Sequence, residues 1–94
     1  QYKKFEAARS QPFFDLLKLI SPQDSPDLLD LGCGDGKLTL TAHQELKAST
    51  TLGIDSSPEM LQQAQLLHDP GLSFQNEDIQ TFHPKTKFHC IISN

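Results

Sequence analysis

The sequence has no long apolar run, only two cysteines and no excess of positive charge. No segment reaches the roughly 20 apolar residues that a membrane-spanning helix needs, and no secretory signal is recognisable. We therefore expect no membrane partner. The formal net charge of -4 disfavours a nucleic-acid backbone as partner. Cys33 and Cys90 lie far apart, which disfavours a disulfide framework and favours a reduced, cytoplasmic setting.

The chain is short, with 94 residues, which suits one small domain at most. It begins at Gln1 rather than Met and stops at Asn94, directly after an apolar run. Both ends have the character of cuts within a longer protein. We therefore expect a fragment of a larger domain.

The first 20 residues carry a helical pattern of apolar side chains, which predicts helices that cover a sheet. Pro12 interrupts this pattern and predicts a kink or two short helices. Residues 21–27 are rich in Ser, Pro and Asp and form a connector by composition.

Beyond the connector, strand-like and helical segments alternate. A serine before Pro58 is expected to cap the second helix, and Ser56 and Glu59 have capping-box spacing. Alternation of this kind predicts βαβ units and therefore a parallel sheet with flanking helices. The predicted strands are residues 28–31, 51–55, 72–75 and 88–92, and the predicted helices are residues 37–46 and the segment that starts at Pro58.

A glycine-rich turn, residues 32–36, joins the first predicted strand to the first helix and is called the glycine loop. Gly32, Gly34 and Gly36 occupy alternate positions in it. Glycines let the backbone turn sharply and touch a ligand directly. The N–H groups of the helix that follows are expected to face the same ligand. This segment predicts a cofactor site at the carboxyl end of a parallel strand.

Three acidic residues, Asp30, Asp55 and Asp78, lie near the carboxyl ends of the first three predicted strands. In a doubly wound sheet these ends line the ligand crevice. A carboxylate after the second strand suits a ribose diol, because it can accept two hydroxyl hydrogen bonds. The ligand is therefore expected to contain a nucleoside, and the acidic surroundings favour some positive charge on it.

Two phosphate-binding motifs fit poorly. A P-loop needs glycine and Ser or Thr where this chain has Leu31 and Leu38. The dinucleotide fingerprint needs glycine where this chain has Lys37, although Asp55 would suit it. The four histidines show no metal-ligand spacing, so no metal is expected; they are His43, His68, His83 and His89.

Four motifs, in order, resemble class I S-adenosylmethionine-dependent methyltransferases. Residues 28–39 resemble the first motif of that superfamily and residues 53–61 its second-strand motif. Residues 76–79 resemble the segment that reads the adenine, and residues 88–94 resemble the fourth-strand motif. Within the superfamily, residues 2–12 are similar to the trans-aconitate methyltransferase group.

The resemblance implies a Rossmann-like α/β fold, of which this chain supplies four strands in the order 3-2-1-4, truncated before strand 5. Residues 1–27 would be N-terminal cap helices and connector, and residues 28–94 the cofactor-binding βαβ units of a partial methyltransferase domain. The fourth strand would then form an exposed edge. Such an edge could pair with a second copy and make a homodimer.

The resemblance also implies the cofactor, S-adenosyl-L-methionine, and the residues that bind it. Asp30 would help to orient its amino group, directly or through water. Asp55 would hold the ribose hydroxyls, and Asp78 would accept from the adenine amino group. Arg9 is a candidate partner for a carboxylate of cofactor or substrate. The implied cofactor-binding residues are Asp30, Gly32, Cys33, Gly34, Asp55, Ser56, Met60, Asp78, Ile79 and Asn94.

The expected activity is methyl transfer to a small-molecule, carboxylate-bearing acceptor. The chemistry resides in the cofactor, so no catalytic base is assigned, and the fragment alone is expected to be inactive. The sequence departs from the pattern of this family at two positions. His89 stands where these proteins usually have aspartate in the fourth strand. Gln11 stands where members of the trans-aconitate methyltransferase group tend to have arginine, which argues against a polyanionic acceptor such as trans-aconitate. The alternatives are a non-catalytic nucleoside-cofactor-binding module and, less favoured, a nicotinamide-dependent oxidoreductase.

Overall fold

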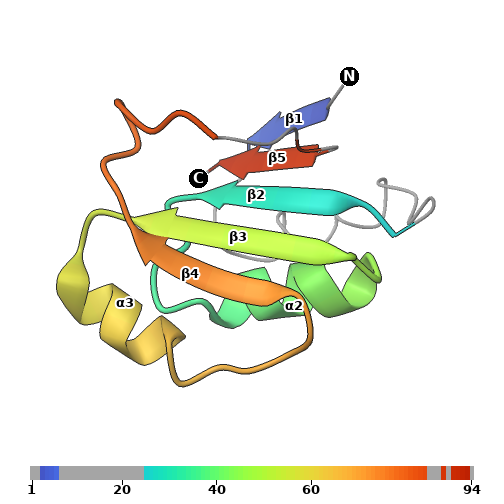
Figure 1. Ribbon diagram of the computed structural model, residues 1–94, viewed down its shortest axis with the longest axis horizontal. Helices are drawn as coiled ribbons and strands as arrows, with labels where there is room; N and C mark the ends of the chain where they lie inside the picture. The colour runs from blue at the N-terminus through green and yellow to red at the C-terminus, as the bar shows by residue number, and fades with distance from the viewer. Residues whose placement is uncertain (1–2, 7–24, 85–87, 89, 94) are drawn as a thin grey trace.

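The computed structural model describes residues 3–6, 25–84, 88 and 90–93. In this part of the chain the strands form one parallel sheet in the order β1-β5-β2-β3-β4 (Figure 1). The predicted order 3-2-1-4 corresponds to β4-β3-β2-β5 and is confirmed. The strands are β1 (Lys3–Glu6), β2 (Asp27–Leu31), β3 (Thr50–Asp55), β4 (Leu72–Asn76) and β5 (Cys90–Ser93).

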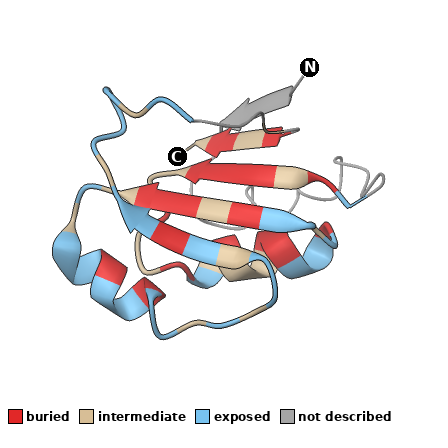
Figure 2. Cartoon of the chain, in the orientation of Figure 1, coloured by how far each residue is buried: buried red, intermediate tan, exposed pale blue. Residues whose placement is uncertain are grey.

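Two helices pack on the same face of this sheet: α2 (Lys37–Glu45) between β2 and β3, and α3 (Pro58–Ala64) between β3 and β4 (Figure 1). Buried residues lie along the middle of β2 and β3 and on the helix sides that face the sheet (Figure 2). One core cluster joins β2, α2 and β5, and the other joins the glycine loop, α3 and β4. Their buried members are Leu28, Ala42, Leu46, Cys90 and Ile92 in the first cluster and Cys33, Leu61, Ala64 and Phe74 in the second.

Strand β2 lies in the interior of the sheet, and three consecutive residues in it are buried. Leu28 and Leu29 are at most 2% exposed, and Asp30 is 1% exposed. Consecutive side chains of a strand point to opposite faces, so β2 is covered on both faces, as expected for a central parallel strand. A carboxylate in this position needs hydrogen-bond partners within the protein.

Ser57 is the N-cap of α3, which confirms the prediction that a serine before Pro58 caps this helix, and its side chain accepts a hydrogen bond from the N–H of Met60. Pro58 follows at the first helical position, where its fixed φ suits the helix. The predicted capping box between Ser56 and Glu59 is therefore wrong by one residue, because a box based on Ser57 would need its partner at position 60. Met60 is 45% exposed and does not share the buried side of α3.

Strand β1 corrects two predictions. Residues 3–6, expected to be helical, form a strand that pairs in parallel with β5, in the register Lys3↔Cys90 to Glu6↔Ser93. The edge of β5 that was predicted to be open is therefore occupied, which removes the structural reason for a homodimer through that edge. A four-residue segment carries little periodicity, and an unpaired edge offers backbone partners that override it. The predicted helices at residues 7–20 lie outside the described residues.

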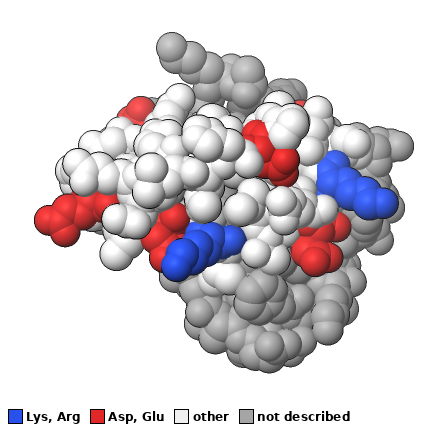
Figure 3. All heavy atoms as spheres, turned by 90° about the horizontal axis from the view of Figure 1, so that it is seen from below, with Lys and Arg blue, Asp and Glu red and all other residues white. Residues whose placement is uncertain are grey.

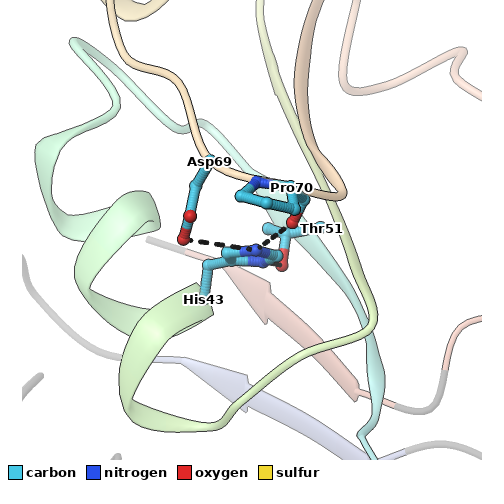
Figure 4. A network of polar contacts seen from close by, with 4 residues as sticks. All are labelled: His43, Thr51, Asp69 and Pro70. Atoms are coloured by element: carbon cyan, nitrogen blue, oxygen red, sulfur yellow. Dashed lines mark hydrogen bonds and ion pairs between the residues drawn. The ribbon is translucent and has the colours of Figure 1, made fainter.

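A buried polar network joins α2 to the turn that precedes β4 (Figure 4). The His43 side chain is 4% exposed; its Nδ1 lies 2.6 Å from Thr51 Oγ1 and its Nε2 lies 2.8 Å from the carbonyl oxygen of Pro70. The Asp69 carboxylate is 3.7 Å from Nε2. These contacts lie at the amino ends of β3 and β4, whereas the glycine loop follows the carboxyl end of β2.

Charged side chains of both signs are interspersed on the face seen from below. Figure 3 shows Lys and Arg atoms at separate places there, with Asp and Glu atoms beside and between them. None of the helices in the described part of the chain has the length and apolar character that a membrane crossing requires.

Candidate cofactor site

The carboxyl ends of β2, β3 and β4 lie side by side at one edge of the sheet (Figure 1). The chain leaves β2 towards β3 on one side, whereas β5 pairs with β2 on the other. The carboxyl end of β2 is therefore the point where the strand order reverses, which is where open α/β sheets bind ligands. The glycine loop begins at this point.

Gly34 and Gly36 are needed in this loop for different reasons. Both have positive φ angles, +59° and +84°. A Cβ on Gly36 would lie 2.8 Å from Phe74 Cζ and 3.0 Å from Ala64 Cβ, so this glycine allows α2 to approach the core. Among the residues that the structure describes, a Cβ on Gly34 would meet no atom within 4 Å. Gly34 therefore presents bare backbone to the open side of the loop, where a ligand can approach it closely.

Several amide groups of the loop donate hydrogen bonds within the protein. Gly32 and Cys33 both donate to the carbonyl oxygen of Ile54, at 2.8 and 2.9 Å. Gly36 donates to the carbonyl oxygen of Cys33, and the Lys37 N–H, at the start of α2, donates to Asp35 Oδ1. The expectation that helix N–H groups face the ligand is therefore not met at Lys37. A phosphate cradle needs amide donors aimed at the ligand, so this geometry agrees with the poor fit to phosphate motifs.

Asp55, at the end of β3, connects the loops at this edge. Its Oδ2 accepts from the N–H of Gly34 and its Oδ1 accepts from the N–H of Ser57, both at 2.9 Å. Its carbonyl oxygen accepts from the N–H of Glu77 and from the Asn76 side-chain amide. A carboxylate has about four lone-pair sites, so each oxygen can still accept one hydroxyl hydrogen bond. The half-buried Asp55 side chain therefore fits the predicted ribose contact.

Asp30 is buried beneath the loop rather than exposed in it. Its side chain is 1% exposed, and its Oδ2 accepts from Thr39 Oγ1 at 2.6 Å. The prediction allowed contact with the cofactor amino group either directly or through water. The burial of Asp30 favours an indirect influence, through the loop whose ends it joins.

The remaining described candidates border the same edge. Asp78 is exposed, and its Oδ1 accepts from the N–H of Gln80, which orders the turn after β4. Ile79 is 39% exposed, and its Cδ1 would lie 3.6 Å from a Cβ on Gly32, so its side chain borders the glycine loop. Ser56 and Met60 are exposed at the start of α3. Arg9 and Asn94 lie outside the described residues, as do Gln11 and His89.

A hollow of about 450 Å³ lies elsewhere, beside β3 and the segment that follows β4. It does not coincide with the glycine loop, and its lining includes none of the predicted cofactor residues. The lining residues are Leu52, Gln75, Glu77, Thr81, Phe82, His83, Pro84 and Phe88.

Sequence reasoning missed Thr39 and Asn76. Both contribute side-chain hydrogen bonds to the acidic residues at the loop, Thr39 to Asp30 and Asn76 to the backbone of Asp55. Thr39 is fully buried, although it is polar and lies in the first turn of a helix. A polar residue on the apolar side of a predicted helix, after a buried acid, is the sequence signal that could have identified it.

These features define a nucleoside-binding α/β domain: a glycine loop at the switch point of a parallel sheet, with a carboxylate after the next strand. Residues 28–94 match the family described as "Methyltransferase domain". The chain belongs to this methyltransferase family, which confirms the predicted class I fold and family.

Relatives and solved structures agree with this assignment. The chain is 42% identical over 80 residues to trans-aconitate 2-methyltransferase of Deinococcus radiodurans, and 37% identical over 93 residues to that of Escherichia coli O45:K1. These alignments cover 85% and 99% of the chain but 31% and 36% of the relatives. The chain thus spans about a third of the length of these relatives.

Two solved structures show the same architecture. One is an S-adenosylmethionine-dependent methyltransferase from Mesorhizobium loti, with a TM-score of 0.76 and 29% identity over 90% of this chain and 39% of that one. The other is the plantazolicin methyltransferase BpumL in complex with SAH, with a TM-score of 0.68 and 27% identity over 89% and 37%.

Proposed function

We propose that this chain forms the cofactor-binding part of an S-adenosylmethionine-dependent methyltransferase with a small-molecule acceptor. The observation that carries the proposal is the Asp55 carboxylate, which is tied to the N–H groups of Gly34 and Ser57 at the switch point of the sheet. The family match and the S-adenosylmethionine-dependent structural neighbours support it.

The described residues suit the different parts of such a cofactor. Asp55 would accept hydrogen bonds from the ribose hydroxyls, and Asp78 would accept from the adenine amino group. Ile79 and Met60 offer partly exposed apolar side chains to the adenine faces. Ser56 is exposed beside them, at the turn into α3.

The glycine loop would pass against the methionine part of the cofactor. Its backbone at Gly32, Cys33 and Gly34 comes close because Gly34 carries no side chain on the open side. The N–H groups of Gly32, Cys33 and Gly34 donate within the protein, so this part of the loop suits a ligand that brings its own donors, such as an ammonium group. Asn94 and Arg9 complete the proposed set, near the methyl group and as partner of a carboxylate, respectively.

When bound, S-adenosylmethionine supplies an activated methyl group on a sulfonium. The contribution of this chain is to bind the cofactor and hold its orientation, which is catalysis by proximity. A carboxylate acceptor needs no general base, so no residue of the chain is assigned to move a proton.

A small-molecule carboxylate is the proposed acceptor class, because relatives at 37–42% identity are trans-aconitate 2-methyltransferases. Trans-aconitate itself is not proposed, because Gln11 departs from the arginine of the similar group. We also propose that the 94-residue chain binds the cofactor but does not complete the reaction by itself. A cytoplasmic location is proposed because the two cysteines, Cys33 and Cys90, lie far apart in the sequence, which disfavours a disulfide framework.

Calorimetric titration of the chain with S-adenosylhomocysteine tests the proposal. The native chain is expected to bind it, and Asp55→Ala to bind at least about tenfold more weakly, because a hydrogen bond to a charged group contributes about 1.5–3 kcal/mol. Asp35→Ala is the matched control, since the Asp35 carboxylate also accepts from a backbone N–H nearby, that of Lys37 at the start of α2.

A native chain that is folded but does not bind S-adenosylhomocysteine would contradict the proposal. An equal loss of affinity in Asp55→Ala and Asp35→Ala would also contradict it. Parallel titration with NAD⁺ separates the oxidoreductase alternative, which predicts binding of the dinucleotide instead. Methyl transfer by the 94-residue chain to an added carboxylate would overturn the proposal that it is inactive alone.

A further inference from the structure

A buried hydrogen bond connects the strand before the glycine loop to the helix after it. Thr39 is 0% exposed and Asp30 is 1% exposed, and Thr39 Oγ1 donates to Asp30 Oδ2 at 2.6 Å. This distance is typical of a hydroxyl that donates to an ionised carboxylate. Asp30 is the second-last residue of β2 and Thr39 the third residue of α2, so the bond joins the two elements that the loop connects.

Helix α2 begins without a side-chain cap. Its N-cap is Gly36, which has no side chain, and the first turn contains no acidic residue. On the exposed side, the preceding Asp35 accepts from the N–H of Lys37. On the buried side, the Asp30 carboxylate of β2 accepts a hydrogen bond from the Thr39 hydroxyl in the first turn of α2. Negative charge at this end of a helix is favourable, so the bond stabilises the position of α2 as well as the orientation of the carboxylate.

Hydrogen bonds within the described part of the chain hold the loop at several places. Gly32 and Cys33 are bonded to the backbone of β3, Gly34 to the side chain of Asp55, and the two flanking elements to each other through Asp30 and Thr39. Thr39 itself is fully buried and does not border the open side of the loop. Any effect of Thr39 on a ligand must therefore act through the loop.

We propose that Thr39 is a positioning residue of the cofactor site: its hydroxyl fixes the Asp30 carboxylate and holds the glycine loop in its ligand-binding shape. This inference rests on the proposed function. It deepens that function because it assigns affinity for the cofactor to a residue that does not contact it.

Three variants of the full chain test the role of the hydroxyl. Thr39→Val keeps the shape of the side chain but removes the donor, and Thr39→Ser restores the donor. Thr41→Val is the matched control, because Thr41 lies on the same helix and its hydroxyl donates only to the carbonyl oxygen of Lys37. Affinity for S-adenosylhomocysteine is measured by calorimetry at a temperature at which circular dichroism shows each variant to be folded.

Thr39→Val is expected to bind at least tenfold more weakly than the native chain, Thr39→Ser within about threefold of it, and Thr41→Val unchanged. Amide hydrogen exchange without ligand provides a second readout. Exchange at Gly34 and Gly36 is expected to accelerate in Thr39→Val but not in Thr41→Val, because the loop loses one of its attachments.

Native affinity in Thr39→Val, even with a lowered melting temperature, would overturn the positioning role, as would a Thr39→Ser variant as weak as Thr39→Val. Thr39→Ala serves if Thr39→Val does not fold. If neither folds, the hydroxyl is required for the fold itself and the proposal is wrong. A native chain that binds no S-adenosylhomocysteine would instead overturn the proposed function, and the inference with it.

Discussion

The N–H of Gly34 donates to Asp55 Oδ2 at 2.9 Å, across 21 residues of sequence. The residue proposed to bind the ribose therefore also shapes the loop proposed to receive the methionine part of the cofactor. Its other oxygen accepts from the N–H of Ser57, the N-cap of α3. One carboxylate thus couples the two loops before any ligand arrives, which reduces the ordering that binding requires.

Replacing Asp55 with Asn should weaken both the fold and the site. Gly34 and Ser57 donate to different oxygens of Asp55, and an amide side chain replaces one of these oxygens by an NH2 group, which would face one of the two N–H groups. We expect a loss of about 1–3 kcal/mol in the free energy of unfolding, and at least tenfold weaker binding of S-adenosylhomocysteine. Urea denaturation and calorimetry measure the two effects, and unchanged stability would show that the two N–H groups do not depend on this carboxylate.

Alanine at Gly34 and at Gly36 should have different consequences. Gly36→Ala places a Cβ 2.8 Å from Phe74 in a left-handed backbone, so we expect about 2–5 kcal/mol of destabilisation. Gly34→Ala carries the backbone cost alone, about 1–2 kcal/mol, because its Cβ meets no atom. Gly34→Ala should nevertheless lose affinity for S-adenosylhomocysteine, since the new methyl group occupies the open side of the loop. Native affinity in this variant would place the ligand elsewhere.

Ile79 should contribute to binding more than to stability. Its side chain is 39% exposed and borders the glycine loop, so Ile79→Ala is expected to change the free energy of unfolding by less than about 1 kcal/mol. Affinity for S-adenosylhomocysteine should fall about three- to tenfold, because a buried methylene contributes about 0.8 kcal/mol. Leu66→Ala is the control, since Leu66 is 72% exposed after α3 and should affect neither quantity.

His43 should contribute to stability and not to binding. His43→Leu removes the partner of Thr51 Oγ1 and of the Pro70 carbonyl, which leaves the buried Thr51 hydroxyl without its partner on α2 (Figure 4). We expect about 1–3 kcal/mol of destabilisation with unchanged affinity for S-adenosylhomocysteine, because the network lies at the opposite edge of the sheet. Asp69→Asn should cost less than about 1 kcal/mol, given the 3.7 Å separation from Nε2. Reduced affinity in folded His43→Leu would show that the two edges are coupled.

Much of the sheet could be predicted because its signals are local. Apolar runs such as Leu28–Leu31 and turn residues such as Gly71 mark where strands begin and end, and the alternation with helical segments predicts parallel pairing. The predictions were wrong where a segment was too short to show a period, or where two neighbouring residues could serve the same role. Lys3–Glu6 carries too few residues to separate a strand from a helix, and adjacent Ser56 and Ser57 are chemically equal candidates for the cap of α3.

The glycine loop and the acidic residues at the carboxyl ends were identifiable from the sequence itself, because spacing and residue type act along the chain. The order of the strands from β2 to β5 followed from the resemblance to class I methyltransferases. Three features depend on the packing of the elements: β1 pairs with β5, Asp55 bonds to both Gly34 and Ser57, and Thr39 donates to Asp30. Thr39 and Asp30 are 9 positions apart and Gly34 and Asp55 are 21 apart, so these hydrogen bonds form only when the elements pack together. The spacing of residues along the chain does not indicate which atoms come into contact.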